Sequence, residues 1–332
     1  MKQRIMIILL VFLLVPLKVY SDNHRAIVTT HHMYSFDSLM QDVKELKEMY
    51  PELISVKKIG QTNFRKPIIA VKVGKGEKSI LIHAAHHGRE WITSMIVMKM
   101  IEEYAEAHKN NVTFEGYDTS ILDRVSIWFV PMVNPDGVTI QQEGFMARVP
   151  KSRWELFLMN GGSTDFSRWK ANGNGVDLNR QYPAGWEDIA GDAPYPFYQL
   201  YKGEKPISSP EVIAMTRFTK EINPLIALAY HSSGRVLYWY YNTKEENINR
   251  DKAIAMKISE VTGYELSDPV QTAVGGGFTD WFIQRFKRPA ITVEVGYPVN
   301  ETSPPLTVFP SEWRRNKTVG LMTAYEAEKI SK

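Results

Sequence analysis

The chain has 332 residues, of which 44% are hydrophobic and 23% charged, the composition of an ordinary globular protein. It contains no cysteine, which excludes disulfide scaffolds, thiolate zinc sites, iron–sulfur clusters and cysteine nucleophiles. The formal net charge is +3, but the first 21 residues carry three basic side chains and no acid. The rest of the chain is therefore neutral, which argues against a nucleic-acid-binding surface.

The first residues predict a secretory signal peptide. Lys2 and Arg4 precede an apolar run over residues 5–17, shorter than the roughly 20 residues that a membrane-spanning helix needs. The alternative is an uncleaved N-terminal anchor. No later stretch is long and apolar enough to span a membrane, so we expect a secreted protein. Its expected parts are a signal peptide at 1–21, cleaved after Ser21, a short tail at 22–33 and one domain at 34–332.

The spacing of apolar residues after the tail predicts short strands that alternate with helices. A first helix is expected at 36–50, with Ser35 as its N-cap and Pro51 as its stop. Strands are expected at 54–59, 68–73, 79–84, 125–130, 225–230, 236–240 and 290–295, and further helices at 91–107, 209–221, 245–262, 278–286 and 311–330. This order predicts an α/β fold, with a largely parallel sheet covered by helices on both faces.

Segment 140–210 is rich in Gly, Pro and Trp and has little periodicity, and loops of that length are usually functional. Several common motifs are missing from the chain: a Walker loop, a Gly-x-Gly-x-x-Gly turn, a Gly-x-Ser-x-Gly elbow and a His-Glu-x-x-His helix. Their absence removes support for nucleotide binding, for serine hydrolysis and for the commonest zinc-protease helix.

Three side chains near strand ends suggest a metal site. His87 and Glu90 follow the strand at 79–84 and are three residues apart, so a helical turn would place both on the same side. A catalytic zinc takes three protein ligands and leaves one position open. His231, which follows the strand at 225–230, is the best candidate for the third ligand. Each residue alone has a structural alternative, since a single His-x-x-Glu or a histidine at a strand end is more often structural.

A buried acid could serve this metal as a general base. Glu294 lies in the apolar strand Ile291–Val295, where a carboxylate is costly unless it has a partner or a function. Burial would raise its pKa toward the range that suits a general base. The alternative is a core ion pair with an arginine.

Four stretches in this order resemble the zinc metallocarboxypeptidase superfamily: His87–Thr93, Val176–Arg180, Tyr230–Ser232 and Thr292–Val295, with Asn134–Gly137 as a further shared feature. The resemblance covers residues 34–327 and implies a mixed eight-stranded sheet flanked by helices. It implies one zinc ion per chain on His87, Glu90 and His231, with Glu294 as the general base. Arg89, Asn179 and Arg180 are implied to bind the substrate, although a structural ion pair is the alternative for the last two.

Two differences from the digestive carboxypeptidases narrow the choice of subfamily. Digestive carboxypeptidases carry a tyrosine before Gly276-Gly277, where this chain reads Val270–Val274. Lys170 stands where they carry the arginine that polarises the scissile carbonyl, and a lysine cannot make a bidentate contact. The alternative for Lys170 is a solvated loop lysine.

Stretches 169–172, 177–184 and 231–239 are similar to a bacterial branch, the γ-D-glutamyl-meso-diaminopimelate peptidases I, but the LysM repeats of its better-known members are absent. The resemblance implies a secreted or cell-wall-associated zinc metallopeptidase acting on the γ-D-glutamyl–diaminopimelate bond of peptidoglycan stem peptides, with no nucleotide or nucleic-acid partner. One alternative is a carboxypeptidase that releases C-terminal L-amino acids, and another is a non-catalytic module that binds cell-wall fragments.

Overall fold

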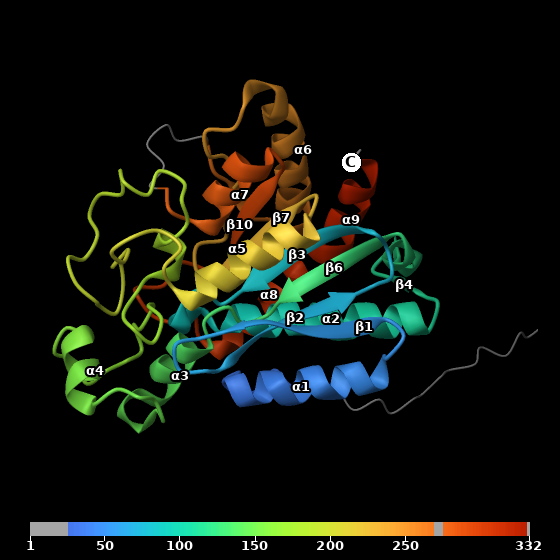
Figure 1. Cartoon of the computed structure of the whole chain (residues 1–332). Helices are drawn as coiled ribbons and strands as arrows, with labels where there is room; N and C mark the ends of the chain where they lie inside the picture. The colour runs from blue at the N-terminus through green and yellow to red at the C-terminus, as the bar shows by residue number, and fades with distance from the viewer. Residues whose placement is uncertain (1–25, 269–274, 331–332) are drawn as a thin grey trace, which may run out of the picture.

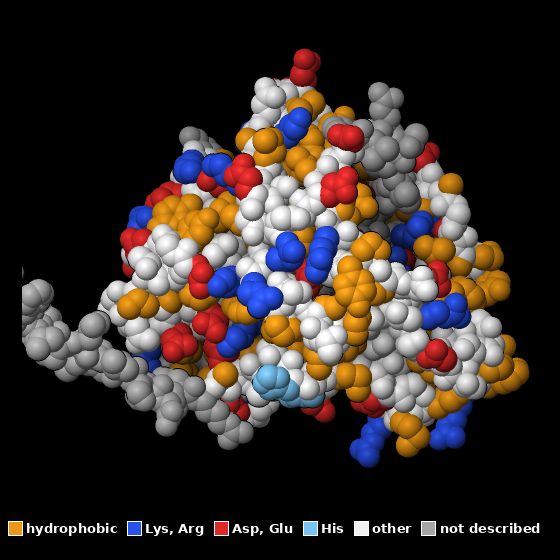
Figure 2. All heavy atoms as spheres, turned by 180° about the vertical axis from the view of Figure 1, so that it is seen from behind, with side chains coloured by type: hydrophobic (Ala, Val, Ile, Leu, Met, Phe, Trp, Pro, Cys, Tyr) orange, Lys and Arg blue, Asp and Glu red, His pale blue; other side chains and the backbone are white. Residues whose placement is uncertain are grey.

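The computed structural model describes residues 26–268 and 275–330, so the signal peptide expected at 1–21 lies outside the described residues. Within them, none of the helices combines the length and the apolar character needed to cross a bilayer. Figure 2 shows acidic and basic side chains interspersed over one face of the molecule.

A mixed eight-stranded sheet forms the centre of the described structure. Figure 1 shows its central strands lying among the helices. Its order is β1-β2-β6-β3-β7-β10-β8-β9. The four strands β6, β3, β7 and β10 run parallel to one another, whereas β1, β2 and β8 pair antiparallel with their inner neighbours. The strands are β1 (Ile54–Gln61), β2 (Pro67–Val73), β3 (Lys78–Ala84), β6 (Val125–Val130), β7 (Ala227–His231), β8 (Val236–Tyr238), β9 (Glu265–Leu266) and β10 (Ala290–Glu294). A separate small hairpin joins β4 (Thr113–Phe114) to β5 (Tyr117–Asp118).

Helices cover both faces of this sheet because its central strands are apolar on both sides. In β3, Ile80 and Ile82 point into one core and Leu81 into the other, as the alternation of side chains along a strand requires. The first core is closed by α1 (Phe36–Met49), α2 (Ile92–Lys109), α6 (Glu245–Thr262), α8 (Phe309–Asn316) and α9 (Val319–Lys329). The second is closed by α5 (Pro210–Ile222) and α7 (Phe278–Phe286). The predicted fold class is confirmed.

The segment predicted as a long loop is largely irregular but contains one short α-helix, two 3-10 turns and the end of a further helix. Helix α4 (Arg153–Met159) begins at a reciprocal cap in which Ser152 and Glu155 satisfy each other's backbone amides. Before it lies α3 (Pro135–Glu143), which was not predicted and begins at the Asn134 cap. A third apolar cluster around Ile140, Leu156 and Trp169 supports these loops, which lie beside α3 and α4 in Figure 1.

The single helix predicted at 311–330 is wrong, because the structure has two helices there, α8 and α9. The buried Tyr104 of α2 lies at the break between them. Its hydroxyl donates to the carbonyl oxygen of Lys317 at 2.7 Å and accepts from the amide of Gly320 at 3.1 Å. A side chain from a distant helix thus takes over backbone groups that one continuous helix would pair internally.

Candidate active site

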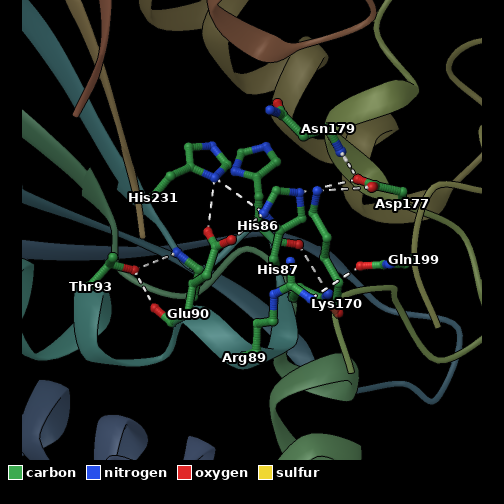
Figure 3. A network of polar contacts seen from close by, with 12 residues as sticks. His86, His87, Arg89, Glu90, Thr93, Lys170, Asp177, Asn179, Gln199 and His231 are labelled. Carbon is green, nitrogen blue, oxygen red and sulfur yellow. Dashed lines mark hydrogen bonds and ion pairs between the residues drawn. The ribbon is translucent and has the colours of Figure 1, made fainter. Parts of the chain in front are cut away.

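Three neighbouring parallel strands end at the same edge of the sheet and bring the predicted ligands together. Strand β3 leads into the loop that holds His87 and the 3-10 turn Gly88–Glu90. His231 is the last residue of β7, and Glu294 is the last residue of β10. Figure 3 shows His87, Glu90 and His231 pointing toward one another from these elements. Ligand sites gather at the carboxyl ends of parallel strands for this topological reason.

The loop that holds His87 and Glu90 is fixed by close packing against the start of α3. A Cβ atom on Gly88 would lie 2.4 Å from the carbonyl oxygen of Gly137, so only glycine allows this approach. The side-chain amide of Asn134 donates to the carbonyl oxygen of His86 at 3.0 Å. Residues 134–137 therefore have a structural role here, because they hold the loop in place.

The three predicted ligands form the one group of metal-ligating side chains found among the described residues, with ligand atoms within 4.8 Å of one another. His87 Nδ1 lies 2.8 Å from Glu90 Oε1, and His231 Nδ1 lies 2.9 Å from Glu90 Oε2. The two Nδ1 atoms are 3.2 Å apart. All three residues are buried, with at most 3% of their surface exposed.

The outer contact of His87 bears on whether this arrangement suits a cation. Its Nε2 atom lies 3.1 Å from Asp177 Oδ1, and a neutral imidazole that donates its one proton there keeps a lone pair on Nδ1. Burial lowers the pKa of His231, which favours the neutral form of that ring. Two nitrogens and a carboxylate then converge, and a zinc ion with imidazole and carboxylate ligands fits this donor set.

Asp177 orients His87, a role that was not predicted from the sequence. Its side chain is fully buried and also accepts from the amides of Asn179 and Leu200 at 3.2 and 3.3 Å. Burial alone would raise the pKa of Asp177, but Lys170, His87 and Arg180 outweigh that effect and hold the pKa well below its ordinary value. Asp177 is thus an ionised partner for the outer nitrogen of His87. The sequence signal that could have indicated this role was the position of Asp177, two residues before the predicted substrate-binding residue Asn179.

A cavity of about 430 Å³ opens beside these ligands. It is lined by Lys170, Asp177, Asn179, Arg180, Tyr238, Tyr240, Ser267, Asp268, Gly275, Gly277, Asp280, Thr292 and Glu294. Burial raises the pKa of Glu294, and the nearby Glu90 carboxylate raises it further. The predicted base therefore faces a cavity, and its surroundings raise its pKa above that of an ordinary glutamate.

The same cavity is lined by three side chains that we expect to act on the substrate: Lys170, Asn179 and Arg180. Lys170 Nζ lies 3.3 Å from Asp177 Oδ2, and Arg180 Nε lies 3.8 Å from that atom. The Arg180 Nη1 atom is buried and has no hydrogen-bond partner among the described residues. Asn179 accepts from the amide of Phe278 at 3.0 Å, which ties it to the start of α7.

Arg89 does not line this cavity. Its Nη1 atom donates to the carbonyl oxygens of Arg168 and Glu301 at 3.2 Å and to Gln199 Oε1 at 3.1 Å. It therefore joins the segments around Arg168, Gln199 and Glu301. The stretch 270–274, where digestive relatives carry a tyrosine, lies outside the described residues.

The chain is similar to known proteins over most of its length. A family model described as zinc carboxypeptidase matches residues 39–318. A γ-D-glutamyl-L-diamino acid endopeptidase 1 of Lysinibacillus sphaericus is 36% identical over 301 residues, which are 90% of this chain and 73% of the relative. Mast cell carboxypeptidase A of Mus musculus is 28% identical over 220 residues, 63% of this chain and 48% of that protein.

Solved structures resemble the chain in fold. Bovine thrombin-activatable fibrinolysis inhibitor, in complex with a tick carboxypeptidase inhibitor, superposes with a TM-score of 0.72 at 17% identity. The match covers 90% of this chain and 98% of that one. At this identity, the likeness concerns the arrangement of the sheet and its helices.

Proposed function

The chain belongs to the zinc carboxypeptidase family and is a zinc-dependent peptidase, and from this premise we propose that it hydrolyses the γ-D-glutamyl–diaminopimelate bond of peptidoglycan stem peptides. The main support for this substrate is the 36% identity to a γ-D-glutamyl-L-diamino acid endopeptidase over 90% of the chain. Because the matched family model describes a zinc carboxypeptidase and similar relatives are named as peptidases, we do not retain the alternative of a non-catalytic binding module.

In this proposal His87, Glu90 and His231 hold the zinc ion. When bound there, zinc supplies Lewis acidity that polarises a substrate carbonyl and makes a water molecule more acidic. Asp177 keeps His87 in the tautomer that presents Nδ1, through its 3.1 Å contact with Nε2.

Glu294 is proposed as the general base and acid. Its carboxylate would accept a proton from the attacking water and then deliver that proton to the leaving nitrogen. The support for this role is its place at the end of β10, next to His231 and facing the cavity. Its raised pKa suits a group that must first take up a proton and then release it.

Lys170 and the pair Asn179–Arg180 are proposed to stabilise charge on the substrate. The ammonium group of Lys170 would balance the negative charge that develops on the carbonyl oxygen. Arg180 would bind a substrate carboxylate, which would satisfy its buried and unpartnered Nη1 atom. Asn179 would add an amide contact. We call Asn179 and Arg180 the carboxylate clamp.

Arg89 is proposed to bind the substrate from the rim of the site. Among the described residues, the hydrogen bonds of its guanidinium all come from Nη1, so its other nitrogens remain as donors. A substrate segment upstream of the scissile bond would bring carbonyl oxygens for them.

The protein is further proposed to be secreted or cell-wall associated, with a signal peptide at 1–21 and a catalytic domain at 34–332. The basic residues and short apolar run at the N-terminus support this proposal. N-terminal sequencing of the exported protein should begin at residue 22.

A carboxypeptidase acting on ordinary L-peptides is the second candidate. It is favoured by the similarity to mast cell carboxypeptidase A and by a cavity arginine suited to a terminal carboxylate. Purified protein should be incubated with the stem tripeptide L-Ala-γ-D-Glu-meso-diaminopimelate and with an α-linked tripeptide of L-amino acids. Chelator-sensitive release of L-Ala-D-Glu, seen by mass spectrometry, supports the first candidate. Cleavage of the α-linked peptide alone would support the second.

A further inference from the structure

Two consecutive histidines hold the two ends of the short segment that carries the carboxylate clamp. At one end, Asp177 Oδ1 lies 3.1 Å from Nε2 of the ligand His87. At the other end, the hydroxyl of Tyr182 lies 2.9 Å from Nε2 of His86. Asn179 and Arg180 lie between these two contacts. The clamp is therefore attached on both sides to the loop that carries the metal ligands.

The contact between His86 and Tyr182 is shielded from water, since both residues are 0% exposed. The ring of Tyr182 meets Phe278 edge-on, with ring centres 5.4 Å apart and an angle of 87°. The other ring nitrogen of His86, Nδ1, has no hydrogen-bond partner among the described residues. The hydroxyl of Tyr182 is thus the partner that fixes the orientation of the His86 ring.

The same segment is also held to the wall of the cavity. The amide of Tyr182 donates to the carbonyl oxygen of Gly276 at 2.9 Å, and Phe278 donates to Asn179 at 3.0 Å. A Cβ atom on Gly276 would come within 3.2 Å of the Arg180 Cα atom, so the two backbones touch. These contacts with Gly276 and Phe278 position the segment against α7. The two histidine contacts set its distance from the metal ligands.

We propose that Tyr182 and His86 are a positioning pair that sets the reach from the metal ligands to the carboxylate clamp. The pair thereby selects substrates whose carboxylate lies at a fixed distance from the scissile bond. This inference rests on the proposed function of Asn179 and Arg180. Neither Tyr182 nor His86 touches the substrate in this arrangement, and their effect passes through the clamp.

Tyr182→Phe tests the pair, because it removes one hydroxyl and keeps the packed ring. The substrates are L-Ala-γ-D-Glu-meso-diaminopimelate and the same tripeptide with both diaminopimelate carboxylates converted to amides. We expect KM for the acid to rise about three- to ten-fold, the effect of one lost hydrogen bond, with kcat and zinc content unchanged. The amide should show no such rise. Calorimetry on the Glu294→Gln variant measures binding of the acid without hydrolysis. Adding Tyr182→Phe to that variant should raise the Kd of the acid by the same factor as it raises KM.

Tyr104→Phe is the matched control, since Tyr104 is equally buried and its hydroxyl bonds Lys317 and Gly320, neither of which lines the cavity. It should destabilise the fold without changing KM. An unchanged KM in Tyr182→Phe, an equal rise in Tyr104→Phe, or a loss of zinc from Tyr182→Phe would each overturn the inference. Equal KM values for acid and amide in the wild-type enzyme would instead refute the clamp itself, and the inference with it.

Discussion

Glu294 and His231 are register partners in adjacent parallel strands. Both residues end their strands, and the amide that follows Glu294, that of Val295, donates to the carbonyl oxygen of His231 at 2.8 Å. The sheet ladder therefore fixes the proposed base beside a proposed zinc ligand. Their relative position depends on backbone pairing in the core, which is the most rigid way to hold two functional groups.

Glu294→Gln should abolish most of the activity and leave the metal site intact. Glutamine has nearly the same shape but cannot accept and return a proton, so kcat is expected to fall by about 10²- to 10⁴-fold. Zinc content, measured by elemental analysis, should not change. Glu265→Gln, at an exposed position of β9, is the control and should keep full activity. Undiminished hydrolysis by zinc-loaded Glu294→Gln would show that another group is the base.

Asp177→Asn should weaken zinc binding although Asp177 is not a ligand. An amide at this position no longer provides the negative charge that orients His87 and supports its basicity. Loss of such partners typically costs 10- to 100-fold in metal affinity or activity, and we expect a decrease of about that size. Competition with a chromogenic chelator measures it. The remote His108→Ala, which loses only a contact with Asp123 at 3.1 Å, should bind zinc like the wild type. Unchanged affinity in Asp177→Asn would contradict the orienting role.

The sequence could place the three candidate ligands near one another because each lies at or just after the end of a strand, and strand ends can be located from apolar runs. Helix α6 and strand β6 were predicted with their observed bounds, since their apolar spacing is regular. The break between α8 and α9 depends on Tyr104, more than 200 positions away, and no local pattern reveals it. The role of Asp177 likewise depends on a contact with His87, 90 positions away in the chain.

The stability of the fold should fall as pH rises, partly through Glu211. This residue of α5 is fully buried, and burial raises its pKa to about 8, with a further contribution from Asp136. The unfolded chain loses this proton near pH 4.5, while the folded chain keeps it to about pH 8. The stabilising effect of the protonated form is thus complete below pH 4.5 and is lost as pH rises toward 8.

Glu211→Gln mimics the protonated carboxyl and tests this effect. Its Tm should exceed that of the wild type at pH 8, and the difference should shrink at pH 5, as measured by thermal unfolding across that range. Glu221→Gln, an exposed position of the same helix, should follow the wild-type pH profile. Parallel pH profiles for Glu211→Gln and the wild type would show that Glu211 does not carry the dependence.

Lys170→Met should reduce kcat more than it changes KM, because the ammonium group is proposed to act on charge that develops only in the transition state. We expect a loss of about 10²- to 10³-fold, the usual cost of removing one oxyanion-stabilising group. Lys170→Arg should recover much of the rate, since it restores the cation in the cavity.

Lys202→Met is the control, because Lys202 lies over Trp186 and does not line the cavity. Lys170 also pairs with Asp177, so zinc content must be measured in each variant. If Lys170→Met lost activity only in proportion to lost zinc, Lys170 would support the metal site through Asp177 and would have no part in stabilising the carbonyl oxygen.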